Sequence, residues 1–299
     1  MSEENREIRR ILLPAEGAAV GKATVITGPT ASGKSALALD LAARRGLHII
    51  NADSRQVYHG IPIVTAMPSA DELASVPHHL IDMLPLEAYY SAARFEEDAL
   101  RVARSEMERC GEVVVCGGSM MYVDAFCHGI DLLPEVPEAI RRATYAEVAE
   151  RGDAWALEEL RRLDPDYYAI VDRCNMKRVV HALEIIRTAG CTFTSLRTGR
   201  RLARDFDIEL LYIDLPRPEL FHRINTRVDA MVAAGLEEEA RSVYDRRGLN
   251  SLNTVGLKEM FAWFDGSLDR AVAIERIKKN TRVYAKKQIT WHRRRSQKS

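Results

Sequence analysis

The chain of 299 residues carries 43 Lys and Arg against 43 Asp and Glu, so its formal net charge at pH 7 is zero. That balance excludes a wholly basic nucleic-acid binder of the histone type. With 46% hydrophobic and 29% charged residues, the composition is that of a folded globular protein rather than a disordered one. The length favours one large domain with an insertion, or two domains.

The N-terminal segment, residues 1–22, mixes acidic and basic side chains ahead of the short apolar run Ile11-Leu12-Leu13. It lacks the apolar stretch of a secretory signal and the acid-poor bias of a transit peptide. No run approaches the roughly 18 apolar residues of a membrane-spanning helix. The five cysteines are odd in number and form no Cys-x-x-Cys pair, which favours reduced, mostly buried thiols. We therefore expect a cytoplasmic protein.

The first predicted unit is a strand at residues 23–27, followed by a glycine-containing loop and a helix from about residue 36. The loop, Gly28-Pro29-Thr30-Ala31-Ser32-Gly33-Lys34-Ser35, matches the phosphate-binding pattern G-x-x-x-x-G-K-[ST] in full. Its N–H groups can surround a diphosphate, the Lys34 ammonium can neutralise the oxygens and the Ser35 hydroxyl can ligate Mg²⁺. The pattern does not name the ligand, because any diphosphate ester satisfies the same donors.

Further strands are predicted at residues 47–50, 113–116 and 208–213, with a helix between the first two that Ser91 caps and Gly111 ends. The alternation predicts an α/β fold with a parallel, doubly wound sheet of the P-loop NTPase type. Asp53 follows the second strand and so lies at the carboxyl edge of the sheet, where open α/β folds bind ligands. It can act as a general base or cap the next turn. Asp214, after the last strand, can contact a metal or serve as a turn residue.

Between residues 128 and 200 the pattern is helical only, which predicts a helical insertion domain within a catalytic core of residues 1–127 and 201–299. Helices begin at Pro137, Asp153 and Asn175. After Leu236 the chain is helical and increasingly basic. Residues 276–299 hold ten Lys or Arg and no acid, so residues 1–275 carry a net charge of −10. The neutral total therefore conceals a basic stripe suited to RNA phosphates.

Several segments together resemble the tRNA dimethylallyltransferases, also called tRNA isopentenyltransferases (IPP transferases). Besides the phosphate-binding loop, they are residues 53–58 (DSRQVY), 76–82 (VPHHLID), 117–122 (GGSMMY) and 281–291 (TRVYAKKQITW). The resemblance runs from Ala23 to about Arg293. It implies an enzyme that transfers a dimethylallyl group from dimethylallyl diphosphate to the N6 amine of the adenosine at tRNA position 37, beside the anticodon.

The resemblance also implies catalytic roles. An adenine amine is a poor nucleophile because its lone pair is delocalised, so a base must remove its proton; Asp53 is the candidate. Lys34, the loop amides, Mg²⁺ held through Ser35, and Arg217 would stabilise the leaving diphosphate. Arg217 could alternatively be a solvated arginine at a helix start. Ser119, a further catalytic candidate, stands where the family usually has Thr and keeps a hydroxyl that can hydrogen-bond the reacting groups. Met120 and Met67 replace a usual Gly and Lys.

The acceptor side requires recognition of a splayed base in single-stranded RNA. The resemblance implies tRNA contacts from Asp53, Ser54, Arg55, Gln56, Ser119, Arg141, Lys177, Arg178, His181, Asn253, Gly256 and Lys258. His181 replaces the usual Arg, and Leu257 replaces the usual Tyr. Taken singly, each basic residue could equally lie on a solvated helix surface.

Three alternatives remain open. A prenyltransferase acting on free adenylate would share the loop and Asp53, but it needs neither a helical insertion nor basic helices. A small-molecule P-loop kinase would need a nucleobase pocket and an arginine-rich lid. A P-loop RNA-binding switch predicts that Asp53→Ala spares function. Whether ATP binds is undecided by the sequence, and we expect a monomer.

The adjacent His78 and His79 invite a zinc interpretation. Neighbouring histidines point in different directions on most backbones, and no carboxylate or thiol completes a ligand spacing around them. We therefore expect a hydrogen-bonded structural pair and no zinc site.

Overall fold

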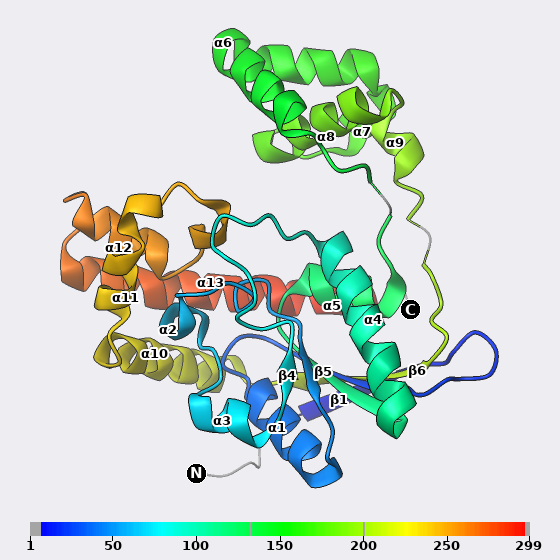
Figure 1. Cartoon of the computed structure of the whole chain (residues 1–299). Helices are drawn as coiled ribbons and strands as arrows, with labels where there is room; N and C mark the ends of the chain where they lie inside the picture. Colours follow the sequence, from blue (N-terminus) through cyan, green and yellow to red (C-terminus); the bar gives the residue numbers. More distant parts are fainter. Residues whose placement is uncertain (1–6, 132, 200, 297–299) are drawn as a thin grey trace. The chain divides into compact units, whose positions relative to one another are not determined.

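The computed structural model describes residues 7–131, 133–199 and 201–296 (Figure 1). The chain divides into two compact units, with boundaries between His128 and Gly129 and between Leu202 and Ala203. We call Gly129–Leu202 the helical unit and the remainder the core unit. No helix among the described residues is both long enough and apolar enough to cross a membrane.

The core unit is built on a six-stranded sheet with the order β1-β6-β2-β5-β3-β4. The strands are β1 (Glu7–Leu13), β2 (Lys22–Thr27), β3 (Ile49–Asn51), β4 (His78–His79), β5 (Glu112–Cys116) and β6 (Asp207–Asp214). All pairs are parallel except β1, which runs antiparallel to β6. The predicted α/β fold is confirmed, with one difference: β1 adds an antiparallel edge.

Both faces of the sheet are covered by helices. Alternate residues such as Ile50 and Val115 pack on one side against α4 (Ala92–Cys110) and α5 (Met120–His128). Their neighbours Ile49 and Val114 pack on the other side with α1 (Lys34–Arg45). Side chains of a strand alternate between faces, so a sheet buried on both sides reads as continuous apolar runs. This is why the central strands were predictable.

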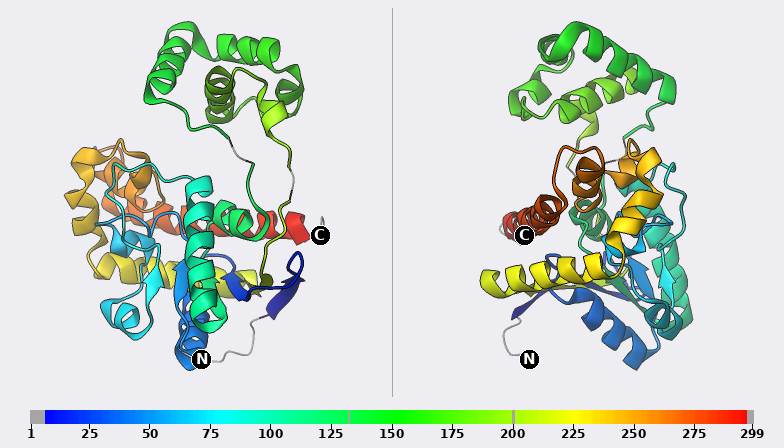
Figure 2. Two further views of the ribbon diagram at one scale, coloured as in Figure 1. Left: turned by 45° about the vertical axis from the view of Figure 1, so that its right-hand side comes forward. Right: turned by 90° about the vertical axis from the view of Figure 1, so that its left-hand side faces the viewer.

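The C-terminal part of the core unit is helical, as expected. It contains α10 (Arg217–Ala233), α11 (Leu236–Ser242), η2 (Tyr244–Arg246), η3 (Asn250–Leu252), α12 (Leu257–Phe264) and α13 (Arg270–Ser296). Earlier in the chain, the short helices α2 (Pro62–Thr65) and α3 (Ala70–Ser75) lie between β3 and β4. Helix α13, orange to red in Figure 2, packs against α10, α12 and α5. It thereby brings the C-terminal residues of the chain back to the sheet.

The helical unit has its own apolar core. Its elements are α6 (Glu138–Leu163), α7 (Pro165–Ile170), α8 (Met176–Ala189) and α9 (Phe193–Leu196). The two helices predicted around Gly152 form one element with a kink there, where glycine adopts φ 84°. Buried Asp164 accepts hydrogen bonds from Tyr167 N at 3.0 Å and Thr194 N at 2.7 Å, which caps α7 and fixes α9.

Acid is expected to destabilise the core unit through His292. Its imidazole is buried against the Tyr212 ring, with centroids 4.5 Å apart, and burial lowers its pKa to about 4. An unfolded histidine has a pKa near 6.5. Between these values only the unfolded chain binds the proton, so the free energy of unfolding falls by at most roughly 3 kcal/mol as the pH drops from about 6.5 to 4. Urea unfolding across this range should show a weaker pH dependence in His292→Gln; equal slopes would refute this origin.

Candidate active site

A pocket of about 380 Å³ lies in the core unit at the carboxyl edge of the sheet. Its walls come from the phosphate-binding loop, the segments after β3 and β5, and helices α10, α12 and α13. The structure brings the following predicted site residues to it: Thr30, Lys34, Ser35, Asp53, Ser54, Arg55, Gln56, Ser119, Asn253, Gly256 and Lys258. Segments far apart in the sequence therefore meet at the site that the loop and Asp53 indicated.

The phosphate-binding loop is held from two sides. A Cβ on Gly28 would lie 2.7 Å from the Ile213 carbonyl oxygen, so only glycine allows the loop to approach β6 this closely. On the other side, Thr30 N donates to Gln288 Oε1 at 2.9 Å, and Gln288 Nε2 donates to the Gly118 carbonyl at 2.8 Å. Gln288 of α13 thus joins the loop to the turn after β5. The remaining loop residues Gly28, Pro29, Ala31, Ser32 and Gly33 shape the loop without lining the pocket.

Two partly buried cations, Lys34 and Arg227, line the pocket together with the Asp53 carboxylate. Desolvation lowers the pKa of Lys34, and Arg227 lowers it further, whereas Cys116 and Asp53 act in the opposite direction. Burial likewise lowers the pKa of Arg227, opposed by Asp53. Arg227 Nη1 donates to Thr30 Oγ1 at 3.2 Å. Burial raises the pKa of the Cys116 thiol to about 11, so it is neutral. A bound diphosphate would supply a further anionic partner for these partly desolvated cations.

Asp53 is fixed by a local turn. Its backbone N–H donates to Asn51 Oδ1 at 3.1 Å, and its own Oδ1 accepts from Arg55 N at 2.9 Å. The sequence left two roles open for this residue, a turn cap or a base. A carboxylate has two oxygens with about four acceptor positions, so the turn holds the group in the pocket without using up its basic capacity.

Ser119 supports the same turn. Its buried hydroxyl accepts from Ser54 N at 2.7 Å and donates to Ser54 Oγ at 3.1 Å. The hydroxyl that Ser shares with Thr is therefore used to position the residue that follows Asp53. Ser119 is best described as a positioning residue here.

Arg55 and Gln56 hold the pocket walls together. The Arg55 guanidinium donates to the carbonyls of Asn250 at 2.8 Å, Ser251 at 3.0 Å and Asn253 at 3.3 Å. Gln56 Nε2 donates to the carbonyls of Thr65 and Ala66, each at 3.0 Å. Arg55 thus anchors the loop that leads to Asn253, a residue to which the resemblance assigned a tRNA contact, and Gln56 anchors the end of α2.

The segment 253–258 leads into helix α12, whose N-terminal cap is Gly256. Gly256 adopts φ 102°, and its N–H donates to Glu259 Oε2 at 2.8 Å. A Cβ there would lie 2.4 Å from Val64 Cγ2. Lys258, two residues on, is exposed at the pocket rim.

Arg217 is not brought to this pocket. It is exposed at the first turn of α10, beside Asp214 and Arg293 in a separate depression, and Asp214 accepts from Arg9 Nη2 at 3.2 Å. Arg227 of the same helix lies about 15 Å further along the axis and reaches the loop. Sequence reasoning missed it, although Ile224, Arg227, Val228 and Met231 follow the i, i+3, i+4, i+7 spacing of one helix face and all line the pocket.

Arg141, Lys177, Arg178 and His181 all belong to the helical unit. Arg141 Nε lies 3.8 Å and His181 Nδ1 3.5 Å from the carboxylate oxygens of buried Glu184. Lys177 and Arg178 are exposed in the first turn of α8. The structure thus gathers these residues within one unit.

Gly117→Ala is expected to damage the site by steric conflict. A Cβ at this position would lie 2.1 Å from the Ala52 carbonyl oxygen, which is backbone next to Asp53. Overpacking of this kind costs about 1–3 kcal/mol of folding free energy. Urea unfolding should show that loss, and Gly248→Ala, where nothing lies within 4 Å, should match wild type. Equal stability of the two variants would argue against close packing of these turns.

Comparison with known proteins gives one consistent result. The model of the IPP transferase family matches residues 56–295. "tRNA dimethylallyltransferase 1" of Porphyromonas gingivalis is 48% identical over 270 residues, which cover 90% of each chain, and that of Bacteroides thetaiotaomicron is 48% identical over 90% of this chain and 88% of its own.

Solved structures agree. A tRNA isopentenylpyrophosphate transferase from Bacillus halodurans matches with 35% identity and a TM-score of 0.63, covering 91% of this chain and 87% of its own. A eukaryotic dimethylallyltransferase described as acting on tRNA matches with 26% identity and a TM-score of 0.77, covering 91% and 69%. With its phosphate-binding loop and Asp53 in one pocket, the chain belongs to the IPP transferase family, the family of the tRNA dimethylallyltransferases.

Proposed function

We propose that this prenyltransferase moves a dimethylallyl group from dimethylallyl diphosphate to the N6 amine of the adenosine at position 37 of tRNA, giving N6-dimethylallyladenosine. The observation that carries the proposal is a single pocket lined by a diphosphate-binding loop, two partly buried cations and a carboxylate. The loop and the cations can bind the diphosphate leaving group, and the carboxylate can accept the proton of the nucleophilic amine.

The donor diphosphate would bind at the loop. Lys34 and Arg227 supply positive charge there, and Arg227 takes the role that the resemblance gave to Arg217. Ser35 lines the pocket and offers a hydroxyl oxygen, a hard donor that together with diphosphate oxygens suits Mg²⁺, whereas the neutral Cys116 thiol does not. Bound Mg²⁺ would add charge stabilisation for the departing diphosphate. Fixed cations act most strongly in such a desolvated site.

Asp53 would serve as the general base. The N6 lone pair forms a bond to the allylic carbon while the carbon–oxygen bond to diphosphate breaks and its electron pair leaves with the diphosphate. The proton of the amine passes to the Asp53 carboxylate. The turn built by Asn51, Arg55 and Ser119 supports this role because it holds the carboxylate in one orientation before substrate arrives.

The tRNA would be bound by basic residues on the protein surface together with residues at the pocket rim. Helix α13 presents Arg276, Lys279, Lys286, Lys287, Arg293 and Arg294 to solvent. The helical unit adds Arg141, Lys177, Arg178 and His181, and the pocket rim adds Asn253, Gly256 and Lys258. A free mononucleotide would need no such surface. We further propose that the enzyme acts in the cytoplasm, where its tRNA substrate is, and that it acts as a monomer.

Transfer of labelled dimethylallyl groups tests the acceptor class. Purified protein is incubated with labelled dimethylallyl diphosphate, Mg²⁺ and one of three acceptors: a tRNA transcript with A37, the same transcript with G37, or AMP. We expect label in the A37 transcript only. Label in AMP and not in tRNA would establish the adenylate-modifying alternative instead.

A further inference from the structure

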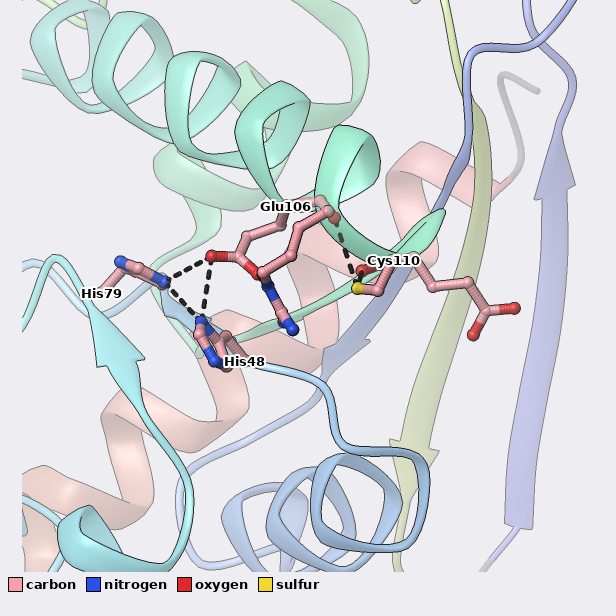
Figure 3. A network of polar contacts seen from close by, with 6 residues as sticks. His48, His79, Glu106 and Cys110 are labelled. Carbon is pink, nitrogen blue, oxygen red and sulfur yellow. Dashed lines mark hydrogen bonds and ion pairs between the residues drawn. The ribbon is translucent and has the colours of Figure 1, made fainter.

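We propose that His48, His79 and Glu106 form a binding site for a divalent transition metal, with Zn²⁺ as the preferred ion, separate from the catalytic pocket. Figure 3 shows the three side chains pointing toward one another from different parts of the core unit. His48 precedes β3, His79 is in β4 and Glu106 is in α4. None of them lines the catalytic pocket, whereas the neighbouring His78 does.

Strand geometry explains why these residues meet. Side chains alternate between the faces of a sheet, and in the parallel register Ile49 pairs with His78 and Ile50 with His79. His79 therefore shares the face of Ile50, which α4 covers. The adjacent histidines do point in different directions, as the sequence indicated. The missing carboxylate comes from a helix 27 residues further along the chain.

The three potential ligand atoms form a nearly equilateral triangle. Glu106 Oε1 lies 2.9 Å from His48 Nδ1 and 3.1 Å from His79 Nε2, and the two nitrogens are 3.2 Å apart. In a tetrahedral zinc site with bonds of about 2.0–2.1 Å, neighbouring ligand atoms are about 3.3 Å apart. The triangle thus has close to the size that a bound zinc ion requires.

With Glu106 ionised, as its ion pair with Arg109 favours, protons alone do not satisfy this triangle. Each imidazole must donate N–H to hydrogen-bond the same carboxylate oxygen, but two donors leave the nitrogen–nitrogen contact without a hydrogen bond. If one nitrogen instead presents its lone pair to the other, its contact with the carboxylate becomes repulsive. A cation at the centre binds all three lone pairs at once. Two histidines and one carboxylate are a common zinc donor set.

The surroundings favour a monodentate carboxylate ligand. Arg109 Nε donates to Glu106 Oε2 at 2.8 Å, which occupies the second oxygen and directs Oε1 toward the histidines. Cys110 is turned away, because its thiol donates to the Glu106 and Glu112 carbonyls (Figure 3).

Such an ion would join three elements of the fold. Strand β4 is only two residues long, and a metal would tie it to β3 and α4. His48 and His79 are partly exposed, so solvent can reach a fourth coordination position. We infer a structural role: the ion binds the folded chain and not the unfolded one, and so stabilises it.

Zinc titration tests the site directly. Protein is freed of metal by dialysis against a chelator, its fold is checked by circular dichroism, and Zn²⁺ affinity is measured by competition with a chromogenic chelator in excess Mg²⁺. We expect one Zn²⁺ per chain and a higher melting temperature with Zn²⁺. His79→Gln should weaken binding by at least about 100-fold, beyond the roughly 10–100-fold typical of an outer-shell change.

A matched control is His59→Gln, because His59 Nδ1 lies 2.9 Å from Asp82 Oδ1 in an exposed pair that is not part of the triangle. It should bind Zn²⁺ as wild type does. His48→Gln provides a second ligand variant if His79→Gln fails to fold. No saturable Zn²⁺ binding by the wild-type chain, or equal affinity in wild type and the ligand variants, would overturn the proposal. These outcomes do not depend on prenyl transfer.

Discussion

Asp53→Asn is expected to lower kcat by about 10²–10⁴-fold, the contribution typical of a general base, while the Kd for tRNA stays near the wild-type value. Asparagine keeps the oxygen that accepts from Arg55 N, so the turn and the pocket shape persist. What it removes is the capacity to take the proton from the adenine amine. The effect should therefore fall on the chemical step.

Single-turnover rates with tRNA already bound isolate that step, and filter binding gives the Kd. Asp71→Asn is a suitable control, because Asp71 is exposed at the start of α3. Unchanged kcat in Asp53→Asn would contradict a role as base. Loss of tRNA binding without loss of the bound-state rate would instead assign Asp53 to recognition.

Arg227→Gln is expected to lower kcat by about 10²–10³-fold and to weaken binding of dimethylallyl diphosphate, whereas Arg217→Gln should behave like wild type. Arg227 is partly buried beside the loop and donates a hydrogen bond to Thr30 Oγ1. Arg217 is exposed in another depression. Charge next to the leaving group in a desolvated pocket acts strongly, and exposed charge acts weakly.

Steady-state kinetics with varied dimethylallyl diphosphate compare the two variants, and Arg227→Lys tests whether charge alone suffices. Circular dichroism verifies that each variant folds. Normal turnover in Arg227→Gln together with a severe defect in Arg217→Gln would mean that the pocket does not bind the diphosphate in the way proposed.

The central fold could be predicted because local signals and tertiary packing agree there. The loop from Gly28 to Ser35 needs its glycines for close approach to β6, and the buried strands read as apolar runs. Strand β1 gave no such signal, since most of its side chains are exposed and its pairing is with β6, some 200 residues away. Short helices such as α2 depend on tertiary hydrogen bonds, here from Ile63 N and Val64 N to Glu239.

The site was predictable in position but less so in detail. The position of Asp53 just after a predicted strand was enough to identify it as a site residue. Arg55 and Gln56 donate hydrogen bonds to backbone carbonyl groups of other segments of the chain. No residue spacing in the sequence reveals these contacts. Arg227 lies on the face of α10 that the helical spacing of Ile224, Val228 and Met231 marks, so this spacing could have identified it. His48, His79 and Glu106 come together through the register of the sheet and the packing of α4. The spacing of the adjacent histidines in the sequence therefore could not reveal that a carboxylate lies beside His79.

Mapping the modified nucleoside is the most direct test of the proposed reaction. A tRNA transcript with A37 is incubated with the protein, dimethylallyl diphosphate and Mg²⁺, then digested with a base-specific ribonuclease, and the fragments are identified by mass spectrometry. We predict one dimethylallyl group per tRNA, attached to N6 of A37, and a strongly reduced initial rate of its formation when Asp53→Asn replaces the wild-type enzyme under the same conditions. Attachment to another nucleotide, or an unmodified transcript alongside a modified free adenylate, would contradict the proposed function.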